Sequence, residues 1–129
     1  MREINGDLIK LAKEKQFDLI AHSCNCQHNF GAGIVKSIAT NFPIAEQVDK
    51  ETFQPKLGDI SITYIPEFHL NIVNCYTQIW FGKAFGVNTK NWNKDDTAKN
   101  RYAAIKECFK KINEQFTGLH IGLHMIELD

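Results

Sequence analysis

The chain lacks any long hydrophobic run. None of its apolar stretches approaches the roughly 20 residues that an α-helix needs to cross a bilayer. The first six residues also lack the apolar core of a signal peptide. These absences argue against a membrane-spanning or exported protein, so we expect a soluble protein of the cytoplasm. Internal repeats and low-complexity tracts are absent too, which argues against a repeat architecture.

Excess charge of either sign is also lacking. Fifteen basic residues balance fifteen acidic ones, so the formal net charge is zero. No overall electrostatic field therefore favours nucleic acid or an anionic membrane, and we expect neither as a partner. A local anion site remains open, because backbone amides can form one without lysine or arginine.

The chain contains four cysteine residues. In an intracellular protein these are expected to be reduced thiols, and Cys75 and Cys108 lie within apolar patterns typical of a core. Cys24 and Cys26 alternate with His22 and His28, a set of residue types that can bind zinc. Strict alternation in an extended segment spreads them over about 20 Å, too far to reach one ion without a sharp turn. We therefore expect no metal and no cofactor.

A length of 129 residues fits one domain covering residues 1–129. Periodicity predicts alternating strands and helices, and hence an α/β fold with a mixed sheet covered by helices on both sides. The predicted strands span Met1–Asn5, Phe17–Ala21, Leu57–Ile65, Phe68–Thr77 and Leu119–Ile126. The predicted helices span Leu8–Gln16, Ile34–Phe42, Ile44–Glu51 and a segment capped by Asp95 or Asp96 that ends near Phe116.

The most informative segment runs from Leu19 to Val35, where an apolar strand leads into a polar loop, two glycines and a helix. Gly31 and Gly33 carry no Cβ, so the backbone can approach a ligand closely. A helix that begins near Ile34 directs its free amides and positive dipole end at the same place. The order predicts a site for an anionic, nucleotide-like ligand, although the glycines could also serve only a tight turn and close packing.

Three stretches together resemble the macro domain family. They are Asn5-Gly6-Asp7-Leu8, His22-Ser23-Cys24-Asn25-Cys26 followed by Gly31-Ala32-Gly33-Ile34-Val35, and Phe42-Pro43-x-Ala45. These sequence motifs are similar to those of the yeast-type ADP-ribose-1″-phosphate phosphatases of that family. The resemblance implies a three-layer α/β/α fold and ADP-ribose, or a derivative, as the ligand. It also implies hydrolysis of the terminal phosphate of ADP-ribose-1″-phosphate.

The resemblance assigns roles to matching positions. Asp7 would accept a hydrogen bond from the adenine amino group, and the backbone of Leu8 would add a second contact. Asn25 would bind the distal ribose, and His22 would act as a base or stabilise the phosphoryl group, which makes His22 and Asn25 the expected catalytic pair. The diphosphate would bind to the amides of Gly31, Ala32, Gly33, Ile34 and Val35.

One departure from the family concerns the end of the chain. Macro domains usually follow the strand matching Leu119–Ile126 with a second glycine-rich loop and a final helix, whereas this sequence ends at Asp129. We therefore expect a fold truncated at its C-terminus, and a gap there would favour self-association. The missing loop and Gln78 argue against hydrolysis of ADP-ribose from proteins. The missing loop favours, as the alternative function, a non-catalytic binder of ADP-ribose, ADP-ribosylated targets or an NAD-derived signal nucleotide, because catalysis needs tighter positioning than binding does.

Each candidate residue also has a simpler interpretation. Asp7 could be the N-cap of a helix beginning at Leu8. His22 could be a core histidine bonded to backbone, and Asn25 could use its side chain only to hydrogen-bond the backbone of its own loop.

Two further features of the sequence remain open. The acidic partner expected for a phosphatase could be Asp95 or Asp96. Four aromatic residues of a Gly- and Asn-rich loop could form a lid, stack on a base or make a small satellite core; they are Trp80, Phe81, Phe85 and Trp92.

Overall fold

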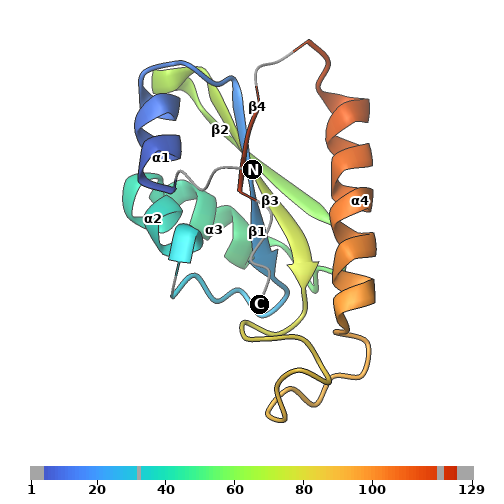
Figure 1. The fold of residues 1–129 in the computed structure, drawn as a ribbon. Coiled ribbons are helices and arrows are strands. Elements are labelled where there is room, and N and C mark those ends of the chain that lie inside the picture. The colour runs from blue at the N-terminus through green and yellow to red at the C-terminus, as the bar shows by residue number, and fades with distance from the viewer. Residues whose placement is uncertain (1–4, 32, 119–120, 125–129) are drawn as a thin grey trace.

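A four-stranded mixed sheet lies at the centre of the computed structural model, which describes residues 5–31, 33–118 and 121–124 (Figure 1). Its strand order is β2-β3-β1-β4. The strands are β1 (Leu19–Asn25), β2 (Ile60–Ile65), β3 (Leu70–Gln78) and β4 (Ile121–His124). Both β3 and β4 run parallel to β1, and β2 runs antiparallel to β3.

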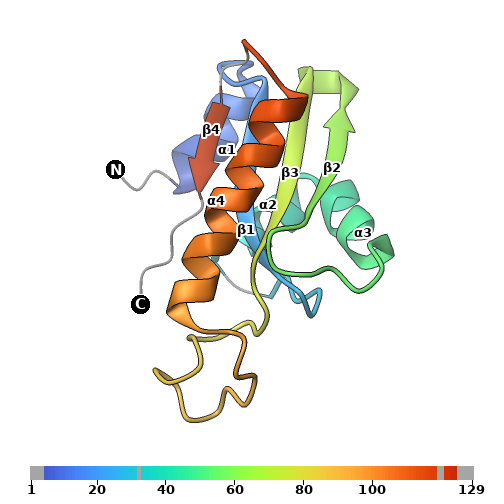
Figure 2. The ribbon, with the colours of Figure 1, turned by 90° about the vertical axis from the view of Figure 1, so that its right-hand side faces the viewer.

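Helices cover both faces of this sheet. One face is covered by α1 (Asn5–Lys13), α2 (Gly33–Asn41) and α3 (Pro43–Glu51), and the other by α4 (Ala98–Gln115). A short 3-10 helix, Pro66–Phe68, joins β2 to β3. Figures 1 and 2 show the resulting three layers from two sides, which confirms the predicted α/β/α architecture with a mixed sheet.

Two hydrophobic clusters hold the layers together. Ile20 and Cys24 of β1 face the cluster beneath α1, α2 and α3, whereas Leu19 and Ala21 face the cluster beneath α4. All four side chains are at most 2% exposed. Burial on both faces explains why the first three residues of β1 are all apolar rather than alternating with polar ones.

The start of α4 differs from the prediction. Thr97 is the N-cap, and its side chain accepts a hydrogen bond from the backbone amide of Asn100. Neither predicted cap is used, because the carboxylate of Asp96 accepts hydrogen bonds elsewhere and Asp95 lies one residue further out. The predicted helix was therefore right in its extent but wrong in its cap.

The start of α1 also differs. The helix begins at Asn5, so Asn5 is not part of a strand and Asp7 lies inside the helix rather than at its N-cap. The remainder of the predicted first strand, residues 1–4, lies outside the described residues, as do residues 119–120 and 125–126 of the predicted last strand. Over the part of the chain that the structure describes, no helix is both long and apolar enough to span a bilayer.

Candidate functional site

Two loops meet at the edge of the sheet where the parallel strands β1 and β3 end. We call residues 26–31 the β1–α2 loop and residues 79–97 the aromatic loop. The backbone amide of Cys26 donates to the carbonyl of Gln78 at 2.9 Å, which ties the start of one loop to the start of the other. The register of β1 against β3 shifts between Cys24 and Asn25, where the pairing skips Thr77 and resumes between Asn25 and Gln78. Ligands of parallel α/β sheets bind at such an edge.

Asn25 organises the β1–α2 loop from its first residue. Its Oδ1 accepts hydrogen bonds from the backbone amides of Gln27 and Asn29, both at 3.1 Å, and its Nδ2 donates to the carbonyl of Asn29 at 2.9 Å. The side chain is 7% exposed. These bonds fold the loop back on itself, as an asparagine commonly does in a turn.

Gly31 and Gly33 are each required for a different structural reason. Gly33 opens α2 with φ at +67°, in the left-handed region that favours glycine. Gly31 donates its amide to Oδ1 of Asn29 at 2.8 Å, and a Cβ on Gly31 would lie 2.8 Å from that same oxygen. The amide of Gly31 is thus engaged within the loop, whereas the first-turn amides of α2 have no partner inside the helix.

The remaining predicted ligand residues lie around the start of α1 and α2. Ile34 is 3% exposed and packs into the core, and Val35 is partly buried against it. Leu8 is 1% exposed, so only its backbone is placed to contact a ligand. Ala32 lies outside the described residues.

His22 lies fully buried in the middle of β1. Its Nε2 is 2.6 Å from Oδ1 of Asn74, and its ring meets Phe30 edge to face with centroids 5.8 Å apart. Asn74 in turn donates to Oγ of Ser61 at 3.1 Å and to the carbonyl of Ala45 at 3.2 Å. The structure therefore places His22 behind Phe30, in the position of a core histidine.

A buried polar chain continues from His22 across the sheet. Oγ of Ser61 lies 3.1 Å from the hydroxyl of Tyr76, which donates to Oδ1 of Asp49 at 2.6 Å. Burial, together with the hydrogen bond to Asp49, raises the pKa of Tyr76, so the phenol keeps its proton. Sequence reasoning missed Asn74, Tyr76 and Asp49. Asn74 and Tyr76 lie within an apolar strand pattern, Asp49 lies within a polar helix, and each pairs with a residue distant in the chain.

The thiols of the motif are protonated. Burial is the main reason that the pKa of Cys24 is raised, and it also raises the pKa of Cys26 to about 12 with a contribution from nearby carboxylates. A thiol in this state is a poor nucleophile and a poor metal ligand. Over the described residues, no group of three or more His, Cys, Asp or Glu side chains is placed to hold a metal ion.

Asp96 holds the aromatic loop together. Its buried carboxylate accepts hydrogen bonds from the backbone amides of Ile79 and Trp80, from Nδ2 of Asn91 and from the guanidinium of Arg101. Burial alone would raise the pKa of Asp96, but these hydrogen bonds, with Arg101 first, outweigh burial and lower it. The loop is thereby fastened to the first turns of α4.

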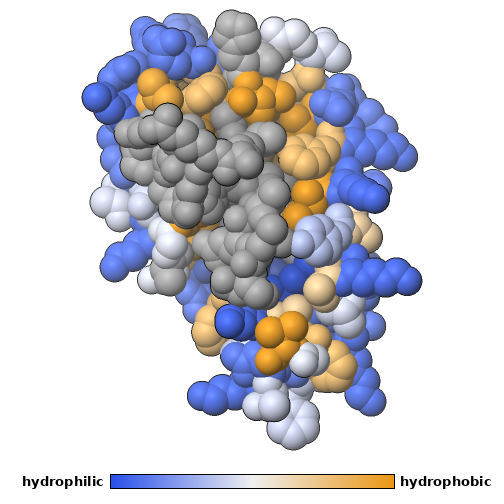
Figure 3. Space-filling model, in the orientation of Figure 1, coloured by the Kyte–Doolittle hydropathy of each residue, from blue (hydrophilic) through white to orange (hydrophobic). Residues whose placement is uncertain are grey.

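The aromatic side chains of this loop lie at or near the surface. The rings of Trp80 and Phe81 lie 4.7 Å apart, but Phe81 is 56% exposed. Trp92 is 87% exposed and Phe85 is 37% exposed, so these two do not belong to a core. Figure 3 shows apolar side chains on the surface of the part of the molecule formed by this loop.

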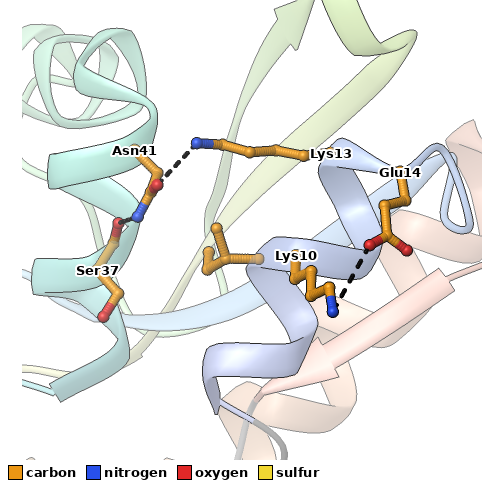
Figure 4. A pocket seen from close by; sticks show the side chains of 6 residues that line it. Lys10, Lys13, Glu14, Ser37 and Asn41 are labelled. Atoms are coloured by element: carbon orange, nitrogen blue, oxygen red, sulfur yellow. Dashed lines mark hydrogen bonds and ion pairs between the residues drawn. The ribbon is translucent and has the colours of Figure 1, made fainter.

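A separate groove lies between α1 and α2. Its volume is about 510 Å³, and Figure 4 shows its lining residues, which are Ile9, Lys10, Lys13, Glu14, Ser37 and Asn41. Nζ of Lys13 donates to Oδ1 of Asn41 at 2.8 Å, and Nζ of Lys10 lies 4.0 Å from Oε1 of Glu14. Both ammonium groups therefore have a partner on the lining of the groove.

Comparison with known proteins supports the fold. No family model matches the sequence, and no curated protein matches it. Among solved structures, a macrodomain protein from Streptomyces coelicolor is similar, with a TM-score of 0.56 and 18% identity over 86% of this chain and 68% of that one. The macrodomain of Thermus aquaticus DarG has a TM-score of 0.57 and 16% identity over 83% of this chain and 66% of that one.

A third similar structure is a protein from Bacteroides thetaiotaomicron, with a TM-score of 0.60 and 21% identity over 83% of this chain and 66% of that one. This chain therefore spans about two thirds of the length of the structures it matches. At such identities the likeness concerns the fold alone. The chain has the α/β fold of macrodomains.

Proposed function

We propose that this chain binds ADP-ribose or a close derivative at the edge of the sheet where β1 and β3 end. The start of α2 carries the proposal, because Gly33 at φ +67° leads into a first turn that contains no acidic residue. The amides of Gly33, Ile34 and Val35 and the positive end of the helix dipole favour a diphosphate at this point. The macrodomain fold supports the same location.

The other contacts are proposed from the resemblance. Asp7 and the backbone of Leu8 would receive the adenine, since both belong to α1, whose first turns lie on the same side of the sheet as α2. Asn25 fixes the loop beside the distal ribose instead of clamping the sugar with a free amide, because its Oδ1 and Nδ2 are already bonded to the loop. Its contribution to affinity is therefore indirect.

Binding without turnover fits the geometry better than hydrolysis of ADP-ribose-1″-phosphate. A base for an attacking water must lie within about 3 Å of that water, whereas His22 is fully buried and covered by Phe30. Asp96, one of the two acidic partners considered, is bound to Arg101 and to backbone amides. These observations favour the non-catalytic binder.

Isothermal titration with ADP-ribose tests the binding proposal, and AMP serves as the control because it lacks the second phosphate and the distal ribose. We expect one ADP-ribose per chain and clearly weaker binding of AMP. No heat at millimolar ADP-ribose would reject the proposal.

Turnover is tested on the same samples by incubation with ADP-ribose-1″-phosphate. We expect the ligand to be recovered unchanged. Phosphate release that the His22→Ala variant abolishes would instead establish the phosphatase and refute the non-catalytic function.

A further inference from the structure

His28 occupies a strained position in the middle of the β1–α2 loop. Its φ is +60°, in the left-handed region that costs a non-glycine residue roughly 1 to 2 kcal/mol. Such a conformation persists where the surroundings stabilise it, and it occurs often at ligand-binding sites. Some contact of His28 must therefore offset the strain.

That contact is with a buried carboxylate of α3. Nδ1 of His28 lies 3.1 Å from Oδ1 of Asp49, whose side chain is fully buried while that of His28 is 27% exposed. Neither Oδ2 of Asp49 nor Nδ1 of His28 has a partner with hydrogen-bond geometry among the described residues, so the contact between Nδ1 and Oδ1 is a close approach at ion-pair distance. The imidazole of His28 is therefore the group of the loop that lies against this buried carboxylate, and a polar group beside it offsets part of the cost of burying it.

Asp49 is itself fixed to the sheet. The hydroxyl of Tyr76 donates to its Oδ1 at 2.6 Å and lies 3.1 Å from Oγ of Ser61. His28 therefore connects the loop, through Asp49 and Tyr76, to the two strands β2 and β3. Neither Asp49 nor Tyr76 lies in the loop or at the start of α2.

We propose that the His28–Asp49 pair is a latch that holds the β1–α2 loop in its ligand-binding shape, with His28 as a positioning residue that does not touch the ligand. Oδ1 of Asn25 accepts hydrogen bonds from the backbone amides of Gln27 and Asn29. His28 lies between these two residues, so the latch acts directly beside those bonds. The expected effect of the latch on ADP-ribose affinity rests on the proposed function, whereas its effect on the conformation of the loop is independent of that function.

A double-mutant cycle with His28→Gly and Asp49→Asn tests the latch. Glycine relieves the strain at φ +60° while removing the imidazole, and asparagine at position 49 keeps an oxygen for Tyr76. Amide hydrogen exchange at Gln27 and Asn29 reports the loop without any ligand. We expect each single variant to exchange faster and the effects to be non-additive by roughly tenfold, as for residues in direct contact.

His28→Asn is the conservative variant. Asparagine tolerates the left-handed region and its side-chain amide can donate a hydrogen bond to Asp49, so we expect exchange close to that of the unaltered protein. A merely structural role for the imidazole ring would make His28→Asn as damaging as His28→Gly. Denaturation curves of all variants verify that each one folds.

Titration of the same variants with ADP-ribose completes the test. We expect weaker binding by His28→Gly and recovery by His28→Asn. Additive exchange rates in the cycle would overturn the latch even if ADP-ribose binds. Coupled exchange rates without any ADP-ribose binding to the unaltered protein would retain the latch and reject the proposed function.

Discussion

The guanidinium of Arg101 donates to both carboxylate oxygens of Asp96, from Nε to Oδ1 at 2.9 Å and from Nη2 to Oδ2 at 2.8 Å. The side chain of Asp96 is fully buried, and that of Arg101 is 17% exposed. Nη2 of Arg101 also donates to the carbonyl of Gly82 at 2.8 Å. This pair fastens the aromatic loop to α4, so the loop is held in one position at the edge of the sheet beside the candidate site.

Replacing Asp96 by asparagine should destabilise the protein by about 3 kcal/mol, because removal of one partner leaves a largely buried charge uncompensated. The measurement is the free energy of unfolding in urea. Asp95→Asn is the matched control, since Asp95 is exposed and its change should stay within about 0.5 kcal/mol. Equal effects of the two variants would show that the Asp96–Arg101 pair does not hold the loop.

Stability should also depend on acid through Asp96. Its pKa is lower in the folded protein than in the unfolded chain, so its contribution is present above the ordinary aspartate pKa of about 3.9 and is lost as pH falls through the folded value. We expect the difference in unfolding free energy between the unaltered protein and Asp96→Asn to be constant near neutral pH and to shrink below about pH 4. A difference that grows on acidification would contradict the assigned direction.

Asn25→Ala should loosen the β1–α2 loop, because three hydrogen bonds are lost at once. We expect a loss of about 2 kcal/mol in unfolding free energy and an ADP-ribose affinity about tenfold lower, measured by titration calorimetry. Asn93→Ala is a suitable control, since Oδ1 of Asn93 accepts a similar hydrogen bond from the backbone amide of Asp95 in the aromatic loop. An unchanged ADP-ribose affinity in Asn25→Ala would show that ligand binding does not depend on the conformation of the β1–α2 loop.

Gly33→Ala and Gly118→Ala form a second matched pair. Both glycines have positive φ, at +67° and +73°, so alanine should cost each about 1 kcal/mol of stability. Only Gly33 opens α2, so only Gly33→Ala should weaken ADP-ribose binding. If the two variants bind alike, the start of α2 does not hold the diphosphate.

The layer order and the strand-loop-helix unit could be predicted from the sequence. The apolar run of β1, the two glycines and the helical spacing after Ile34 are local signals, and they placed the loop at the carboxyl edge of the sheet. Element boundaries were less accurate; the strand predicted from Phe17 begins at Leu19, and the strand predicted from Leu57 begins at Ile60. Local patterns do not specify where hydrogen bonding between strands starts.

The polar partners could not be predicted in the same way. Two aspartates precede α4, and sequence alone does not say that Arg101 and two backbone amides engage Asp96 and leave Thr97 as the cap. Likewise, Asp49 looks like a residue on a solvated helix face, yet it lies buried between Tyr76 and His28. These pairings depend on the tertiary fold, which brings α3 over the sheet.

The most direct test of the whole account is an amide chemical-shift titration of the isotope-labelled protein with ADP-ribose. The account predicts that the largest shifts fall on the β1–α2 loop and the first turn of α2, from Gln27 to Val35. Shifts confined to Lys13, Ser37 and Asn41 in the groove between α1 and α2, or no shifts at all, would contradict it.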